Sequence, residues 1–251
     1  MTETEWMKFT DPWDMLDQIR GPVERIRRVQ GKSNCVIATD RQLLLWGCAC
    51  CRRLGPFVDD TRWLNAIRVV EQFAECEAAY PELLAVGGEM EKWFQDSGNY
   101  ESCTPASLVA RSCADLSGGV DSAFDSMRTP FLCPAYDASR WAVSAVRESA
   151  GQAAAEHEQA MQCLLLHDIL GNPFRPVAVQ AVWRTEPVLA LADKMYRSRS
   201  FGRLPELATA LIQADCKDEI VLNHCRSDAP HVRGCWVVDL LLQREFRLRW
   251  K

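Results

Sequence analysis

The residues best suited to chemistry gather near the C-terminal end of the chain. Two of the four histidines and three of the twelve cysteines lie between Cys216 and Cys235. If this segment is a helix, His231, Cys235 and Asp239 follow one another at four-residue intervals and share one face. A His-x3-Cys pair of that kind can bind one metal ion from successive turns. The segment is therefore the first candidate for a metal site.

A second group of thiols lies in the N-terminal part of the chain. The sequence Cys-Ala-Cys-Cys places Cys48 and Cys51 about one helical turn apart. If this helix packs against the C-terminal segment, the two groups together form a Cys3His set, which suits tetrahedral zinc. The predicted ligands are Cys48, Cys51, His231 and Cys235, with His224 and Cys225 as alternates.

Simple packing is the competing interpretation of these cysteines, so the predicted cofactor is either none or zinc. Free cysteine is among the most buried residue types, and both thiol groups lie in apolar runs. Neither has the two closely spaced ligand pairs of a strong zinc motif. A thiol nucleophile is disfavoured, because Cys235 would lie beside Trp236, where burial raises the pKa of a thiol.

Other polar residues are candidates for pairing or for a polar pocket. The carboxylate of Asp168 can either form a pocket with Asn172 and Arg175 or tie the following loop to the helix end. A carboxylate within the apolar run WVVDLLL needs a partner, which an arginine could supply. The candidates outside the metal set are Asp168, Asn172, Arg175, Arg226, Arg233, Trp236 and Asp239.

The elements that position these residues are predicted to be helices, so we expect an all-α fold. An apolar helix over 41–54 begins after a cap at Asp40, and Asp59 or Asp60 caps the next. An alanine-rich helix runs over 135–170, or is broken near Gly151, and Gly171 ends it. Short helices follow at about 187–199, 205–214, 218–226 and from after Pro230 to about 243. We expect one helical domain, in which residues 1–170, with a variable middle segment, and residues 171–251 share a core.

Composition excludes several classes of protein. Of 251 residues, 48% are apolar and 25% are charged, which excludes disordered and collagen-like chains. The net charge of −5 disfavours a surface for nucleic acid. No phosphate-binding glycine loop, GxSxG or HExxH motif is present. No signal peptide is recognisable, and the apolar run over 43–51 is too short to span a bilayer, so we expect no membrane association and a cytoplasmic location.

Several long segments resemble a large bacterial family of uncharacterised proteins. The resemblance lies in LLLWGCACCRRL, LLHDILGNPFRPV, LADKMYRSRSFGRLPELATALIQADC and LNHCRSDAPHVRGCWVVDLLL. The family has no established activity, so the resemblance implies no reaction. It draws attention to Cys50, Cys51, Arg52, Arg53, Asp168, Asn172, Pro173, Phe174, Arg175, Pro176, His224, Cys225, Arg226, His231, Arg233, Gly234, Cys235, Trp236 and Asp239.

These observations lead to three hypotheses about function. The first is a non-enzymatic binding or adaptor protein, with another protein as partner and with structural zinc as one possibility. The second is a metal-dependent hydrolase, with His224, His231 and Cys235 around the ion and Asp168 or Asp239 as base. The third is a nucleic-acid-binding regulator that uses the basic segments 197–203 and 244–251. The oligomeric state is open.

Overall fold

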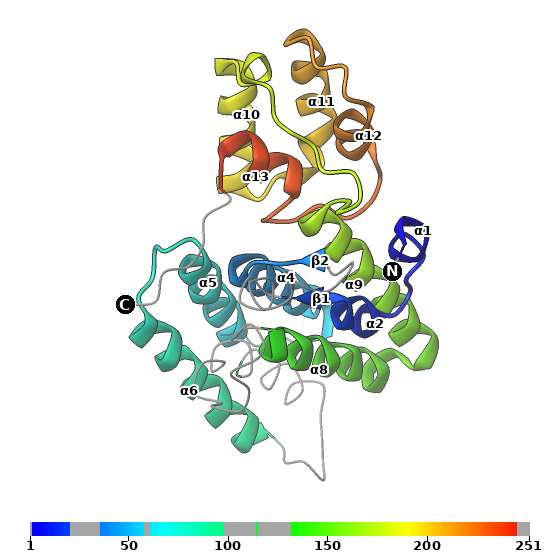
Figure 1. The fold of residues 1–251 in the computed structure, drawn as a ribbon. Coiled ribbons are helices and arrows are strands. Elements are labelled where there is room, and N and C mark those ends of the chain that lie inside the picture. The colour runs from blue at the N-terminus through cyan, green and yellow to red at the C-terminus, as the bar shows by residue number, and fades with distance from the viewer. Residues whose placement is uncertain (1, 21–35, 58–60, 98–113, 115–131, 245–251) are drawn as a thin grey trace, which may run out of the picture. The chain divides into compact units, whose positions relative to one another are not determined.

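The computed structural model describes residues 2–20, 36–57, 61–97, 114 and 132–244, and the fold is all-α (Figure 1). These residues form two compact units, one of residues up to Cys163 and one from Leu164 on. We call them the N-terminal and the C-terminal unit. The predicted boundary after residue 170 lies seven residues later. The last two turns of the alanine-rich helix therefore belong to the C-terminal unit.

The N-terminal unit is built around one largely buried helix, α4. The elements of this part of the chain are α1 (Glu3–Trp6), α2 (Pro12–Asp17), β1 (Ile19–Arg20), β2 (Val36–Ile37), α4 (Asp40–Arg52), η1 (Gly55–Phe57), α5 (Arg62–Ala74), α6 (Tyr80–Ser97), α8 (Leu132–Ala150) and α9 (Gln152–Leu170). Strands β1 and β2 form a two-residue parallel pair. Helix α4 packs against α5 and α8, which explains why apolar residues surround its axis.

Ion pairs fix the end of α4 within this unit. Arg52 binds Glu71 at 2.8 Å, and Arg53 binds Glu158 at 2.8 Å. The two glutamates are buried, whereas the arginines are about 30% exposed, at 31% and 28%. A buried carboxylate requires such a partner, so the arginines of the CACCRR motif hold helices together.

Helix boundaries agree with the sequence in most places. Asp11 caps α2, as expected for an Asp followed by proline. Helix α4 was predicted to begin after Asp40, but its cap is Thr39, whose side chain accepts from the amide of Gln42 while the Gln42 side chain accepts from the amide of Thr39. Asp59 and Asp60, the caps expected for the next helix, lie outside the described residues.

The alanine-rich segment is two helices. Gly151 separates α8 from α9 with a φ of +86°, and Gly171, with a φ of +64°, follows the end of α9. Glycine occupies such left-handed conformations without the steric strain that a Cβ atom brings. The sequence allowed either one long helix or two helices with a break near Gly151, and the structure has the two helices.

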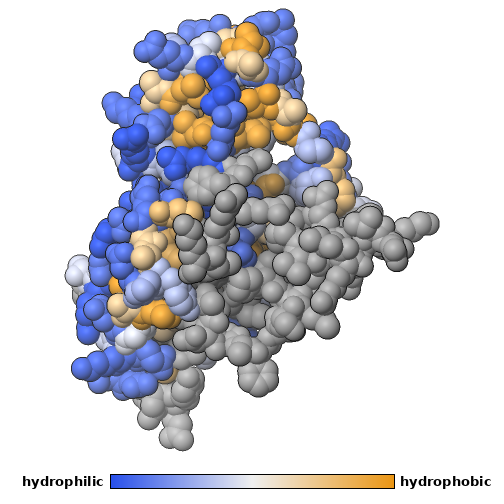
Figure 2. Space-filling view, turned by 60° about the vertical axis from the view of Figure 1, so that its left-hand side comes forward, coloured by the Kyte–Doolittle hydropathy of each residue, from blue (hydrophilic) through white to orange (hydrophobic). Residues whose placement is uncertain are grey.

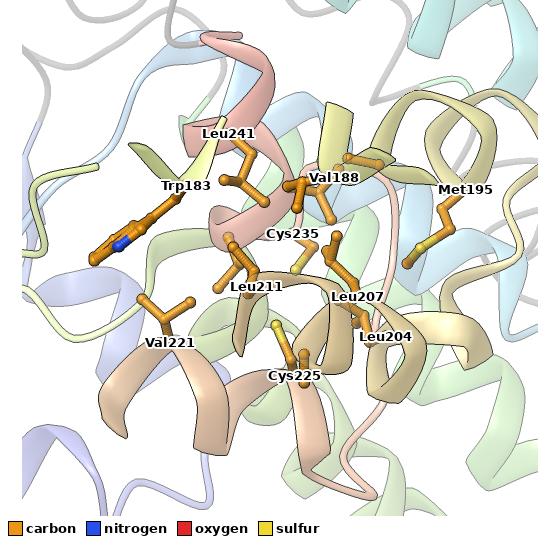
Figure 3. Close-up of a cluster of buried hydrophobic side chains, with 14 of the residues drawn as sticks. Trp183, Val188, Met195, Leu204, Leu207, Leu211, Val221, Cys225, Cys235 and Leu241 are labelled. Atoms are coloured by element: carbon orange, nitrogen blue, oxygen red, sulfur yellow. The ribbon is translucent and has the colours of Figure 1, made fainter. Parts of the chain in front are cut away.

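The C-terminal unit is a set of short helices around an apolar cluster. They are η2 (Ala181–Trp183), α10 (Glu186–Ser198), η3 (Phe201–Arg203), α11 (Leu204–Gln213), α12 (Glu219–Arg226) and α13 (Trp236–Leu242). Figure 3 shows aliphatic side chains from these helices packed together with Cys225 and Cys235. Their burial excludes water and supplies the main stabilisation of this unit.

Some large apolar side chains are exposed on the surface of the described residues. Figure 2 shows apolar side chains between the hydrophilic ones on the visible face of the C-terminal unit. Among the large apolar side chains, Val182 is 54% exposed and Ile212 is 45% exposed. Across the described ranges, no helix has the length and apolarity needed to cross a membrane.

Candidate functional site: a buried Asp-His-His-Cys group

Four potential metal ligands converge inside the C-terminal unit. They are Asp168, in the last turn of α9, His224 in α12, His231 in the loop after α12, and Cys235 at the N-cap of α13. One ligand atom of each lies within 4.8 Å of those of the other three. We call these residues the Asp-His-His-Cys group. It joins segments that are up to 67 positions apart in the sequence.

The carboxylate of Asp168 lies at the centre of this group. Its side chain is 2% exposed. Oδ1 lies 2.6 Å from Nδ1 of His231 and 3.2 Å from Nε2 of His224, and Oδ2 accepts from the amide of Val232 at 2.8 Å. Both carboxylate oxygens are therefore satisfied by the segment that contains the other ligands.

The position of Asp168 is unfavourable apart from these contacts. The C-terminal end of a helix carries partial negative charge, which disfavours a carboxylate there. Burial raises the pKa of Asp168, but the hydrogen bonds from His224 and His231 lower it, and the net pKa lies below its ordinary value. The imidazoles thus keep Asp168 ionised.

The hydrogen bonds of His224 define where its ring hydrogen lies. The indole Nε1–H of Trp236 donates to Nδ1 of His224 at 3.0 Å. An indole nitrogen only donates, so Nδ1 has no hydrogen, and the neutral ring carries it on Nε2. That nitrogen lies 3.2 Å from Asp168 Oδ1 and 3.2 Å from Sγ of Cys235.

His231 has different partners on its two nitrogens. Nδ1 donates to Asp168, and Nε2 lies 3.1 Å from Oγ and 3.4 Å from the carbonyl oxygen of Ser227. The Ser227 hydroxyl donates to the carbonyl of His224 at 3.0 Å, so its oxygen is free to accept from Nε2. Ser227 can therefore accept from Nε2 of His231, while Asp168 accepts from Nδ1 of the same ring.

The order Ser227, His231, Asp168 is that of a serine-hydrolase triad, but the hydrogen bonds oppose that chemistry. A general base needs a lone pair on the nitrogen that faces the hydroxyl. Here Nε2 of His231 faces a carbonyl oxygen as well as Oγ, and the hydroxyl hydrogen is engaged with His224. Ser227 therefore orients the ring of His231.

Cys235 is also unsuited to nucleophilic catalysis. Its side chain is fully buried in the apolar cluster of Figure 3. Burial raises the pKa of its thiol well above the ordinary value, and the charge of Asp168 adds to this effect. A thiolate at this position requires a compensating cation, which a metal ion supplies.

Trp236 connects the group to the end of α9. Its ring lies 5.0 Å from that of His224, and a Cβ atom at Gly171 would lie 3.2 Å from the indole. The absence of a side chain at Gly171 therefore allows Trp236 to pack close to the helix that carries Asp168.

The group fits zinc in ligand type, and part of it already has the spacing that zinc needs. Zinc takes Cys, His and Asp ligands in tetrahedral sites, where bond lengths of about 2.0–2.3 Å place neighbouring ligand atoms roughly 3.3–3.8 Å apart. Nε2 of His224 is already 3.2 Å from both Asp168 and Cys235. The 2.6 Å distance between Asp168 and His231 would have to widen by about 0.7 Å.

The structure assembles only part of the predicted zinc set. His231 and Cys235 lie together, joined by His224, which had been an alternate ligand, and by Asp168. Cys48 and Cys51 are buried in the N-terminal unit, where the Cys48 thiol donates to the carbonyl of Ile67 at 3.8 Å. The grouping found among the described residues does not include them, and their joint site with His231 remains a prediction.

The expectation that His231, Cys235 and Asp239 share one helix face is wrong. Helix α13 begins only at Trp236, because Gly234 has a φ of +95°, which no helix accommodates. His231 therefore lies in a loop, and the amide of Val232 binds Asp168. Contacts with α9, rather than helical periodicity, bring His231 to Cys235.

The other residues that the sequence singled out lie outside the Asp-His-His-Cys group. Cys225 is buried in the apolar cluster and lies outside the Asp-His-His-Cys group, and Asp239 is buried in α13. Asn172 accepts from the amide of Phe174. Arg175 and Arg226 are exposed, and Arg233 stacks on the ring of Tyr196. The sequence did not indicate Ser227 or the amide of Val232 as parts of the site.

Comparisons with protein-family models, with curated proteins and with solved structures found no match to this chain.

Proposed function

We propose that the protein is a non-enzymatic binding protein whose C-terminal unit is held together by one zinc ion. The supporting observation is the convergence of Asp168, His224, His231 and Cys235, with their ligand atoms within 4.8 Å of one another. Four protein ligands fill a tetrahedral zinc ion and leave no position for a substrate.

Burial favours this structural role over a metal-dependent hydrolase. Cys235 is 0% exposed and Asp168 is 2% exposed. The side chains of His224 and His231 are 15% and 7% exposed. A hydrolytic zinc keeps an open position for water, and its substrate has to reach the ion. A set of four protein ligands, two buried and two partly buried, instead joins α9, α12 and α13, and its binding free energy then becomes folding free energy.

The proposed partner is another protein rather than a nucleic acid. In the basic segment 197–203, Arg197 pairs with Asp193 at 2.9 Å, and Arg203 pairs with Glu206 at 2.6 Å. Arginines that are paired with carboxylates contribute less to phosphate binding. The basic tail 245–251 lies outside the described residues. We also propose a reducing, cytoplasmic location, which the free thiols of eight cysteines support. They are Cys48, Cys50, Cys51, Cys76, Cys163, Cys216, Cys225 and Cys235.

Metal content tests this proposal. We expect wild-type protein to contain about one zinc ion per chain by elemental analysis, since structural zinc binds stoichiometrically. Cys235→Ala should retain less than about 0.1 equivalent after mild chelation. Cys225→Ala is the matched control, because Cys225 is equally buried but lies outside the group, and it should retain the metal. Wild-type protein without zinc, or Cys235→Ala with full zinc, would refute the proposal.

A further inference from the structure

We propose that Trp236 limits metal binding, because its indole N–H holds His224 in the form that cannot act as a ligand. This inference rests on the zinc site proposed above. The ring of His224 has a neighbour on each nitrogen. The indole of Trp236 lies at Nδ1, and Asp168 and Cys235 lie at Nε2.

Metal binding and the Trp236 hydrogen bond require different forms of the ring. Coordination needs the lone pair of Nε2, and the hydrogen of a neutral imidazole is then on Nδ1. The indole N–H points at that same nitrogen from 3.0 Å. Two hydrogens would face each other, so the indole has to leave Nδ1 when His224 binds the ion.

His231 has no such conflict. Its Nδ1 points into the group, and its Nε2 lies near the carbonyl oxygen and hydroxyl of Ser227, which can accept a hydrogen bond. A metal-bound histidine usually donates its second N–H to a carbonyl or a similar acceptor. The arrangement around His231 is therefore ready for a metal ion, and His224 is the ligand that has to change.

The exchange balances in hydrogens. A zinc ion that binds all four ligands displaces the thiol hydrogen of Cys235, the Nδ1 hydrogen of His231 and the Nε2 hydrogen of His224, while Nδ1 of His224 gains one. Two hydrogens leave as protons to the solvent. The indole N–H of Trp236 loses its acceptor, and this lost hydrogen bond opposes binding.

Trp236→Phe tests the inference, because it removes the N–H and keeps an aromatic ring beside His224. The variant should bind zinc about three- to tenfold more tightly than wild type in a competition titration with a chelating dye, as expected for one hydrogen bond. Trp183→Phe is the matched control. Trp183 belongs to the same unit, is 2% exposed, and its indole nitrogen has no partner among the described residues. The zinc affinity of Trp183→Phe should equal that of wild type.

The outcomes separate the two proposals. Suppose that wild type binds zinc, but the zinc affinity of Trp236→Phe is no higher than that of wild type or of Trp183→Phe. The role of Trp236 is then refuted and the zinc site stands. If none of the three proteins binds zinc, both proposals fail.

A second measurement does not depend on the folding of a variant. In wild-type protein labelled with 15N-histidine, NMR should show the His224 hydrogen on Nε2 without zinc and on Nδ1 with zinc. A His224 hydrogen on Nδ1 in the zinc-free protein would contradict the inference.

Discussion

Replacing Asp168 by asparagine should destabilise the protein even when no metal is present. The substitution preserves the volume of a side chain that is 2% exposed, but it removes the charge that accepts from His231 and His224. Each hydrogen bond to a charged group contributes about 1.5–3 kcal/mol. Breaking a buried ion pair on one side costs about 3–5 kcal/mol in total. We therefore expect a loss of about 3–5 kcal/mol.

Urea unfolding in the presence of a chelator measures this loss without a contribution from metal. The exposed pair of Asp193 and Arg197 supplies the control, since Asp193→Asn should change the free energy of unfolding by less than about 1 kcal/mol. An Asp168→Asn variant within about 1 kcal/mol of wild type would refute the assignment of Asp168 as the centre of the group.

The loss of stability in Asp168→Asn should depend on pH. The pKa of Asp168 is lowered in the folded protein. Its contribution is therefore fully present above the unfolded value of about 3.9 and is lost as the pH falls through the folded pKa. The difference between wild type and Asp168→Asn should shrink as the pH falls below about 4. A difference that grows as the pH falls below about 4 would contradict this sign.

Three further predictions concern other parts of the chain. Gly171→Ala should destabilise the protein by about 1–3 kcal/mol more than Gly151→Ala in urea unfolding, because both have positive φ but only Gly171 contacts an indole; equal effects would contradict the close contact. Iodoacetamide followed by peptide mass spectrometry should modify the exposed Cys76 well before the buried Cys235 in the native protein, and faster modification of Cys235 would refute its burial. Burial raises the pKa of Asp40 to about 6, so its charged form at pH 7 destabilises the folded state. Asp40→Asn should therefore raise the free energy of unfolding at pH 7 but not at pH 4. Stabilisation at pH 4 alone would contradict this direction.

The helices could be predicted because their signals are local. The cap at Asp11, the break at Gly151 and the helix end at Gly171 depend on residues within a few positions of each boundary. The cap of α4 was misplaced by one residue, since Thr39 and Asp40 are both good capping residues. Only the reciprocal bonds between Thr39 and Gln42 distinguish them.

The candidate site could be predicted in its residue types but not in its arrangement. The sequence singled out His224, His231, Cys235 and Asp168, and the structure brings these four together. Periodicity describes neighbours on one helix, so it could not show that Asp168 binds an amide 64 positions away, at Val232. The positive φ of Gly234, which turns the chain before α13, likewise becomes visible only in three dimensions.

X-ray absorption at the zinc edge tests the central claim most directly, because it counts the sulfur ligands of the bound ion. We expect one sulfur atom and three nitrogen or oxygen atoms, supplied by Cys235, the two histidines and Asp168. Three sulfur ligands would instead indicate the set that includes Cys48 and Cys51. Purified wild-type protein without zinc, or zinc with several sulfur ligands, would contradict the account.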